Sequence, residues 1–262
     1  MTFQFHKYQG TGNDFIILDN RKNLYTSLTP QQVNFLCDRR FGIGADGLML
    51  LQDLPGYDFE MIYYNADGNP GSMCGNGGRC MVKFAHSIGI EKMTYHFLAV
   101  DGPHDAEIDH NGLVSLKMKD INGVKEYHGD FIVDTGSPHY VKMVGDVKGL
   151  DVYRKGKEIR NSNNFVREGI NVNFVASLTD DAIYVRTYER GVENETLSCG
   201  TGVTAAAAIC YHNENGFNDV TVHTPGGKLN VEYDRHDDDH YDNIWLTGPA
   251  VKVFEGMISV ND

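Results

Sequence analysis

The pattern C-G-x-G occurs twice in this sequence, within NADGNPGSMCGNGGR at residues 65–79 and within YERGVENETLSCGTG at residues 188–202. Each copy places a cysteine, Cys74 or Cys199, directly before a glycine turn that leads into a segment of helical composition. At the start of a helix, unpaired backbone N–H groups and the positive end of the helix dipole stabilise a thiolate. One such cysteine would suggest a nucleophile, whereas two in equivalent places indicate a matched pair of bases.

The order of the expected elements around the two cysteines is repeated as well. Alternating or apolar runs predict strands at 3–8, 15–19, 47–51 and 59–64 before the first cysteine, and at 114–118, 131–134, 139–143, 170–176 and 183–188 before the second. The cysteines are 199 − 74 = 125 residues apart, close to half of the 262 residues. We therefore predict an internal duplication. Residues 1–118 with a returning segment at 251–262 would form one domain, and residues 119–250 the other.

Three helices are expected from their caps and apolar spacing. The first begins after Thr29, has Pro30 in its first turn and continues to Gly42. The second follows Cys74 and ends near Gly89, and the third covers 202–211. The acidic segment 232–242, which contains two histidines, is predicted to be the solvated tip of a hairpin rather than a metal cluster.

Composition excludes several classes of protein. Hydrophobic residues make up 41% and charged residues 23% of the chain, which is typical of a soluble globular protein. No apolar run approaches the ~20 residues of a membrane-spanning helix, and the first residues lack the pattern of a secretory signal. The net charge of −13 argues against a nucleic-acid partner. Five cysteines without a C-x-x-C pair favour free thiols in a reducing cytoplasm over disulfides or a zinc site.

A matched pair of thiol bases, one on each face of a carbon atom, can invert that carbon, for example the α-carbon of an amino acid. One thiolate removes the hydrogen, and the other thiol delivers a proton to the opposite face. General acid–base catalysis supplies roughly 10²–10⁴-fold per group, which is too little for so weak a carbon acid. The carboxylate of the developing carbanion must therefore be stabilised too, and the expected donors are the backbone N–H groups of Gly75, Asn76, Gly200 and Thr201.

Further motifs are spread over the whole chain: GTGNDF at 10, FGIGADG at 41, GSPH at 136, INVNF at 170, TPGG at 224 and LTGPA at 246. Together with the two cysteine segments, they resemble the diaminopimelate epimerase family. The resemblance implies an isomerase that converts LL- to meso-2,6-diaminopimelate for lysine and peptidoglycan synthesis, with no pyridoxal phosphate, other cofactor or metal. It also implies a cytoplasmic homodimer of an α/β fold. Each of its two pseudo-symmetric domains would be a curved, mostly antiparallel sheet around a central helix, with the active site in the cleft between them.

The same resemblance assigns roles to individual residues. Cys74 and Cys199 would exchange the roles of proton donor and acceptor with the direction of reaction. The residues expected to hold the amino and carboxylate groups of the substrate are Asn13, Asn65, Asn171, Glu189 and Arg190, besides the helix-start residues Gly75, Asn76, Gly200 and Thr201. The planar fork of Arg190 matches a carboxylate, and Glu189 can accept from an ammonium group. His139 is expected to support the thiols by tuning their protonation.

Some positions depart from the family pattern. Certain members have glutamine at Gly47 and asparagine at Ser137, so the resemblance assigns neither residue a substrate contact. The loop at 193–195 is one residue longer than in some members.

Three other functions stay open at this point. The chain could be another cofactor-independent racemase, acting on proline or hydroxyproline, although the separate amide and arginine positions favour a substrate with a second amino and carboxylate group. It could instead be a thiol redox protein that joins Cys74 and Cys199 in a reversible disulfide, but the sequence shows no docking surface for a redox partner. The third alternative is a binding module with inert cysteines.

Overall fold

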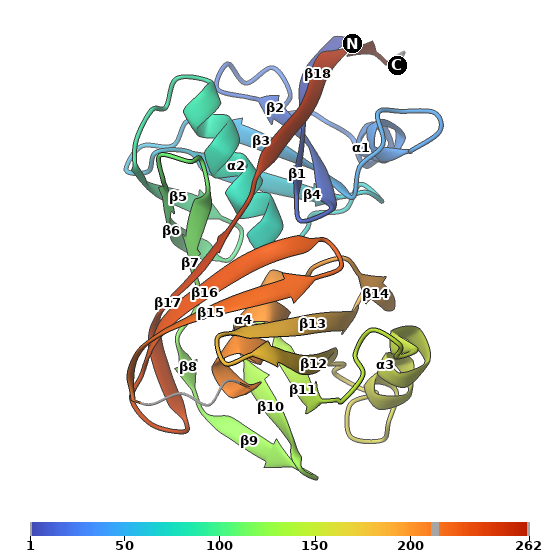
Figure 1. Ribbon diagram of the computed structural model, residues 1–262. Coiled ribbons are helices and arrows are strands. Elements are labelled where there is room, and N and C mark those ends of the chain that lie inside the picture. The colour runs from blue at the N-terminus through green and yellow to red at the C-terminus, as the bar shows by residue number, and fades with distance from the viewer. Residues whose placement is uncertain (1, 211–214, 261–262) are drawn as a thin grey trace. The chain divides into compact units, whose positions relative to one another are not determined.

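The computed structural model describes residues 2–210 and 215–260. The chain divides into two compact units, the first made of Met1–Leu116 with Gly248–Asp262 and the second of Lys117–Thr247 (Figure 1). The last described strand therefore belongs to the same unit as the first.

The first unit is a mostly antiparallel arrangement of strands packed against one helix, α2 (Gly75–Ser87). Its strands are β1 (Thr2–Gly10), β2 (Asn13–Asp19), β3 (Gly47–Gln52), β4 (Glu60–Asn65), β5 (Thr94–Ala99), β6 (Gly102–Ile108), β7 (Val114–Lys117) and β18 (Val251–Ser259). The pairs β2–β3 and β4–β5 are parallel, and the other pairs within this unit are antiparallel. Helix α1 (Pro30–Cys37) connects the first parallel pair, and α2 connects the second.

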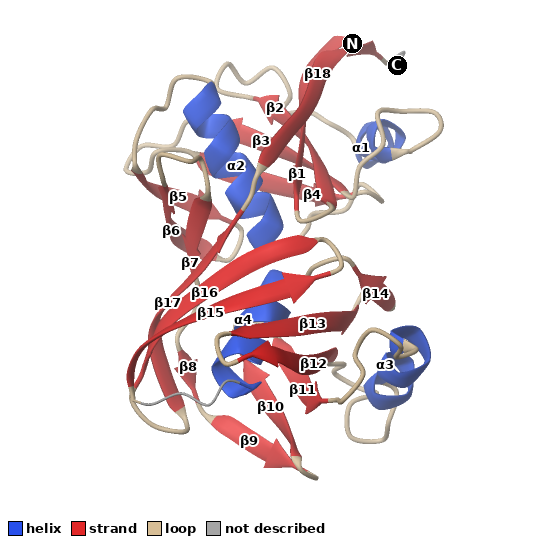
Figure 2. Cartoon of the chain, in the orientation of Figure 1, coloured by secondary structure: helices blue, strands red, loops and turns tan. Residues whose placement is uncertain are grey.

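The second unit repeats this plan around helix α4 (Gly200–Cys210). Its strands are β8 (Ile121–Asn122), β9 (Val124–Tyr127), β10 (Asp130–Asp134), β11 (Pro138–Met143), β12 (Asn171–Thr179), β13 (Ala182–Glu189), β14 (Asn194–Thr196), β15 (Gly216–Thr224), β16 (Gly227–Arg235) and β17 (His240–Gly248). The parallel pairs are β11–β12, connected through α3 (Val152–Arg160), and β13–β15, connected through β14 and α4. The expected mixed α/β, two-domain fold is confirmed, and Figure 2 shows the helices and strands of each unit.

The composition of the two buried helices explains how closely strands can pack against them. In α2, Gly77 and Gly78 face Met49, Met73 and Leu116, and an added Cβ at Gly78 would lie 2.6 Å from Met73 Cε. In α4, four successive alanines, 205–208, are all buried. Small side chains therefore let the sheet of each unit approach the helix that follows its cysteine.

Several expected boundaries were wrong. Helix α1 ends at Cys37 instead of Gly42, because Asp38 turns to an extended conformation and its Oδ1 accepts from the backbone N–H groups of Arg40 and Phe41. Phe41 is 77% exposed and does not continue the apolar face. Helix α4 begins at Gly200, two residues earlier than expected, and its expected end at 211 lies outside the described residues.

Other parts of the second half follow the expectation only in part. The acidic segment belongs to a hairpin, but its tip is shorter than expected. Only residues 236–239 form the tip, because residues 232–235 and 240–242 lie in the antiparallel strands β16 and β17, where Tyr233 and Tyr241 are buried. Its two histidines pair with neighbouring acids, His236 with Asp242 and His240 with Asp237. No helix in the described part of the chain is long and apolar enough to cross a membrane.

Candidate active site

Cys74 occupies the N-cap position of α2. Its backbone is extended (φ −120°, ψ 120°), and its carbonyl oxygen accepts from the N–H of Gly78 at 2.8 Å, so the helix starts immediately after it. The half-buried thiol Sγ donates to Asn13 Oδ1 at 3.4 Å. The glycine turn thus places a thiol at the positive end of α2, as the sequence indicated.

The amide of Asn13 is oriented by its partners on both sides. Its Nδ2 donates to Asp46 Oδ2 at 2.6 Å, and a carboxylate can only accept, so its Oδ1 must face Cys74. The same Oδ1 accepts from Asn76 Nδ2 at 3.4 Å. Asn13 lies 61 residues before Cys74 in the sequence, and the fold brings it to the helix start that carries Cys74 and Asn76.

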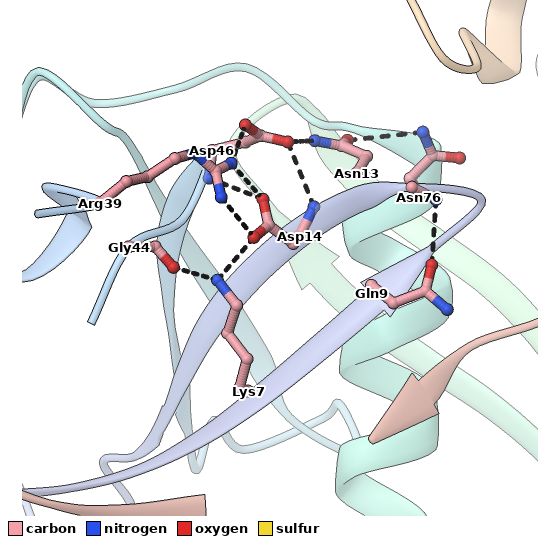
Figure 3. A network of polar contacts seen from close by, with 9 residues as sticks. Lys7, Gln9, Asn13, Asp14, Arg39, Gly44, Asp46 and Asn76 are labelled. Atoms are coloured by element: carbon pink, nitrogen blue, oxygen red, sulfur yellow. Dashed lines mark hydrogen bonds and ion pairs between the residues drawn. The ribbon is translucent and has the colours of Figure 1, made fainter. Parts of the chain in front are cut away.

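Asp46 belongs to a network of ion pairs beside this helix start (Figure 3). Arg39 pairs with Asp46 at 2.7 Å and with Asp14 at 2.6 Å, and Lys7 pairs with Asp14 at 2.7 Å. Burial by itself would raise the pKa of Asp14, but hydrogen bonds from Arg39 and Lys7 hold that pKa well below its usual range. Asp14 is therefore ionised, and both acids pair with Arg39. Asp46 accepts from the Asn13 amide nitrogen, which leaves Asn13 Oδ1 facing Cys74.

In the second unit, Cys199 is followed by α4 and contacts a hydroxyl. Its carbonyl oxygen accepts from the N–H of Val203 at 2.8 Å, and its Sγ lies 3.6 Å from Thr201 Oγ1. Thr201 Oγ1 is also 2.9 Å from Nε2 of His139, a fully buried histidine on β11. A chain of hydrogen-bond contacts thus connects His139 through the Thr201 hydroxyl to the sulfur of Cys199.

The hydrogen-bond partners of His139 decide its tautomer. Asn173 Nδ2 donates to the Tyr140 carbonyl oxygen and lies 3.0 Å from His139 Nδ1, so Nδ1 accepts and the proton of the neutral ring is on Nε2. Burial lowers the pKa of His139 to about 3, so the ring is neutral at neutral pH. Nε2–H therefore donates to Thr201 Oγ1, and this hydroxyl can in turn donate to the sulfur of Cys199.

A second cluster in this unit joins Asn171, Ser137 and Arg190. Asn171 Nδ2 donates to Ser137 Oγ at 2.9 Å, and Asn171 Oδ1 accepts from the backbone N–H of Arg190 at 2.8 Å. The guanidinium of Arg190 donates to the Glu168 carbonyl oxygen (3.0 Å) and reaches Ser137 Oγ (3.4 Å). Among the described residues no carboxylate pairs with this exposed guanidinium, which leaves its charge available for an anion.

The loop that carries Arg190 is tied to α3. Glu193 Oε1 accepts from Arg160 Nε at 3.2 Å, and Glu193 Oε2 accepts from the hydroxyl of Tyr188 at 3.2 Å. Glu189 ends β13 immediately before Arg190 and is half-buried. The ion pair between Glu193 and Arg160 therefore connects this loop to α3.

Asn65 and Gly47 lie opposite each other at the ends of β4 and β3. Asn65 is exposed, and its Nδ2 donates to the Pro70 carbonyl oxygen at 3.4 Å within the turn that leads to Cys74. A Cβ at Gly47 would lie 2.4 Å from the ring of Tyr63, so this ring occupies the space that a side chain at position 47 would need. Tyr63 is a feature that the sequence reasoning missed.

Other residues around the cysteines were missed as well. Asp46 orients Asn13, and Asn173 fixes the tautomer of His139; the sequence shows both only as members of longer motifs. The remaining described cysteines differ from the two at the helix starts, since burial raises the pKa of Cys37 and of Cys80 to about 12. No group of three or more His, Cys, Asp or Glu in the described part of the chain is placed to hold a metal ion.

Comparison with solved structures shows the fold. A phenazine biosynthesis protein of the PhzF family from Bacillus anthracis superposes with a TM-score of 0.73 at 15% identity, covering 99% of this chain and 100% of that chain. A probable proline racemase from Agrobacterium radiobacter gives a TM-score of 0.65 at 16% identity, covering 99% and 93%. The architecture is therefore the one shared by these two groups of proteins.

Sequence comparison is more specific. The family model described as diaminopimelate epimerase matches residues 5–122 and 131–253. A diaminopimelate epimerase from Flavobacterium psychrophilum is 46% identical over 256 residues, covering 97% of this chain and all of the relative. One from Chlorobaculum tepidum is 43% identical over 261 residues, covering 96% and 99%. The chain belongs to the diaminopimelate epimerase family, which is a family of isomerases.

Proposed function

We propose that this protein interconverts LL- and meso-2,6-diaminopimelate by proton transfer between two cysteines, without a cofactor. The observation that carries the proposal is the full-length similarity to diaminopimelate epimerases, together with a thiol at the same place in each repeat. The product would feed lysine and peptidoglycan synthesis.

The proposed mechanism assigns one face of the α-carbon to each thiol. A thiolate at Cys74 or Cys199 removes the α-hydrogen, and the thiol of the other cysteine protonates the carbanion from the opposite face. The helix-start N–H groups of Gly75, Asn76, Gly200 and Thr201 stabilise the carboxylate as negative charge develops, each good donor being worth about 3 kcal/mol in the transition state. Reversal of the reaction exchanges the two roles.

The binding residues are proposed from their placement within each unit. Arg190 would bind a carboxylate with its planar fork, oriented by Asn171 and Ser137. Glu189 would accept from an ammonium group, and Asn13 and Asn65 would present amides from the first unit. His139 would act through Thr201 as a neutral donor that keeps the hydroxyl pointing at Cys199.

A homodimer in the cytoplasm is the proposed state of the protein. The exposed side chains of Val253, Phe254 and Met257 on β18 support a contact with a second copy, because apolar side chains on one edge strand favour association. Analytical ultracentrifugation should show a dimer that Met257→Glu weakens. A monomer in the unsubstituted protein would contradict this part of the proposal.

The direct test is isotope exchange. Pure protein incubated with diaminopimelate in heavy water should place deuterium at one α-carbon, as measured by NMR, and should convert LL to meso isomer. Proline and hydroxyproline, incubated in parallel, should exchange no hydrogen. Exchange with proline alone would assign the chain to the first alternative, and reversible disulfide formation without exchange would assign it to the redox class.

A further inference from the structure

Helix α2 contains a buried cation that the proposed mechanism does not use. Arg79 lies five residues after Cys74, and its side chain is completely buried. Its Nη2 donates to Asn76 Oδ1 at 2.7 Å, its Nη1 approaches the Gly75 carbonyl oxygen at 3.5 Å, and its Nε has no hydrogen-bond partner. Burying a charge with so few partners is costly unless an opposite charge compensates it.

The candidates for that opposite charge are few. Burial lowers the pKa of Arg79, and the negative charges that would raise it are those of Cys80 and Cys74. A guanidinium stays protonated in proteins, so Arg79 is a cation. Burial raises the pKa of Cys80 to about 12, which keeps Cys80 a neutral thiol at neutral pH. The remaining group is Cys74, half-buried at the start of the same helix.

We propose that Arg79 is the internal counter-charge of the Cys74 thiolate and thereby a positioning residue for proton transfer in the first unit. The inference rests on the proposed function, since it concerns the ionised form of a cysteine expected to act as a base. Arg79 also reaches Cys74 through side chains: it orients the amide of Asn76, whose Nδ2 donates to Asn13 Oδ1, 3.4 Å from Cys74 Sγ. Arg79 touches none of the reacting atoms, so it acts on the thiolate through its charge. The chain of contacts ends at Asn13 Oδ1, which accepts from the protonated thiol and therefore holds the neutral form of Cys74 in place.

The second unit has no such cation at the equivalent position. The shift of 125 residues places Thr204 where α2 has Arg79, because 79 + 125 = 204. Thr204 is buried, and its Oγ1 donates to the Gly200 carbonyl oxygen at 3.1 Å, which repeats the contact of Arg79 with Gly75 without the charge. The two thiolates are therefore stabilised differently, by a cation in the first unit and by the Thr201 hydroxyl in the second.

Other charges near α2 are already paired. Asp46 and Asp14, the acids nearest to Asn13, pair with Arg39, and Asp14 also pairs with Lys7 (Figure 3). The remaining titratable groups of α2 and of the strands packed against it have partners away from the helix start or are exposed: His6 with Glu255, Lys252 with Glu255, Tyr8 with Ser87, Asp19 with Arg21, Lys83 with the Gly112 carbonyl oxygen, His86 with Tyr95, His104 with Asp101, Asp105 with His96, and exposed Glu107.

The test measures the ionisation of Cys74 in the absence of substrate. Iodoacetamide labelling of Cys74 is followed against pH by peptide mass spectrometry in a Cys199→Ala background, where no second thiolate can respond. Arg79→Met and Arg79→Gln should raise the midpoint by about one unit, which lowers the labelling rate at pH 7 about tenfold. Arg79→Lys keeps the charge and should restore most of the shift. Thr204→Val, the matched change in α4, should leave the Cys74 midpoint unchanged.

Two results would overturn the proposal. One is an unchanged midpoint in a neutral variant of Arg79 that urea unfolding shows to be folded. The other is an equal shift in Arg79→Lys and Arg79→Gln, which would indicate a packing role without a role for charge. The labelling experiment contains no diaminopimelate, so it can give the expected midpoint shift even in a protein that does not epimerise this substrate. Failure of the proposal for Arg79 can therefore be distinguished from failure of the proposed epimerase function.

Discussion

Acid should destabilise this protein partly through His139, and the structure sets the size of the effect. The ring is completely buried and neutral, with a pKa lowered by burial from 6.5 to about 3. Between these two pH values the unfolded chain binds a proton at His139 that the folded chain does not bind. The free energy of unfolding therefore falls as the pH drops below 6.5, and below about pH 3 His139 causes no further loss. At pH 4.5 the loss is (6.5 − 4.5) × 1.36, or about 2.7 kcal/mol.

The assay is urea unfolding at pH 7 and at pH 4.5, followed by the fluorescence of Trp245. This residue is the single tryptophan of the chain and belongs to the same unit as His139. The His139→Gln variant lacks the titrating ring. On acidification from pH 7 to pH 4.5, the free energy of unfolding of this variant should therefore decrease by about 2–3 kcal/mol less than the free energy of unfolding of the unsubstituted protein. His110→Gln, at an exposed turn, is the matched control and should behave like the unsubstituted protein. If His139→Gln and the control lose the same stability on acidification, His139 is not a buried neutral ring.

Four further outcomes are expected. Thr201→Val removes the hydroxyl that reaches Cys199 and should lower kcat about 10- to 100-fold, given the roughly 1.5–3 kcal/mol of a hydrogen bond to a charged group; unchanged kcat would exclude the hydroxyl from the mechanism. Arg190→Lys loses the planar fork and should raise KM for diaminopimelate about tenfold or more, as initial rates would show. Gly202→Ala places a Cβ 2.3 Å from Asn173 Oδ1 and should lower the free energy of unfolding by about 1–3 kcal/mol in urea titration. Dialysis against a chelator, with reductant present, should leave the epimerisation rate intact, and activity restored by zinc would contradict a purely thiol-based mechanism.

The sequence predicted those features of the structure that depend on a short stretch of neighbouring residues. The glycine turns after Cys74 and Cys199 mark real helix starts, and the repeated order of elements reports a repeated fold. Sequence reasoning failed where side-chain hydrogen bonds compete with the apolar pattern, as when Asp38 ends α1 early. Helix α3 was missed because its apolar face is narrow: Val152 and Ile159 are its core contacts, with the small Gly156 between them. Asp151, whose side chain caps the helix, was the available signal.

The site was predictable only in part for a related reason. Residues at conspicuous turns, such as Asn13 and Arg190, could be singled out from the sequence, but their partners come from distant segments. Asp46, which orients Asn13, and Asn173, which sets the tautomer of His139, are ordinary members of a loop and a strand until the fold brings them together. A one-dimensional pattern shows which residues are available and does not show which of them meet.

The central claim is that the two cysteines serve opposite faces of one α-carbon. It is tested most directly by α-deuterium uptake from heavy water with Cys74→Ala and with Cys199→Ala, measured separately for LL- and meso-diaminopimelate. Each variant should lose nearly all epimerisation, because one half of the proton transfer has no partner. Residual exchange should persist with one stereoisomer only, and the preferred stereoisomer should reverse between the two variants. Epimerisation at close to the unsubstituted rate in either variant would contradict the two-base mechanism.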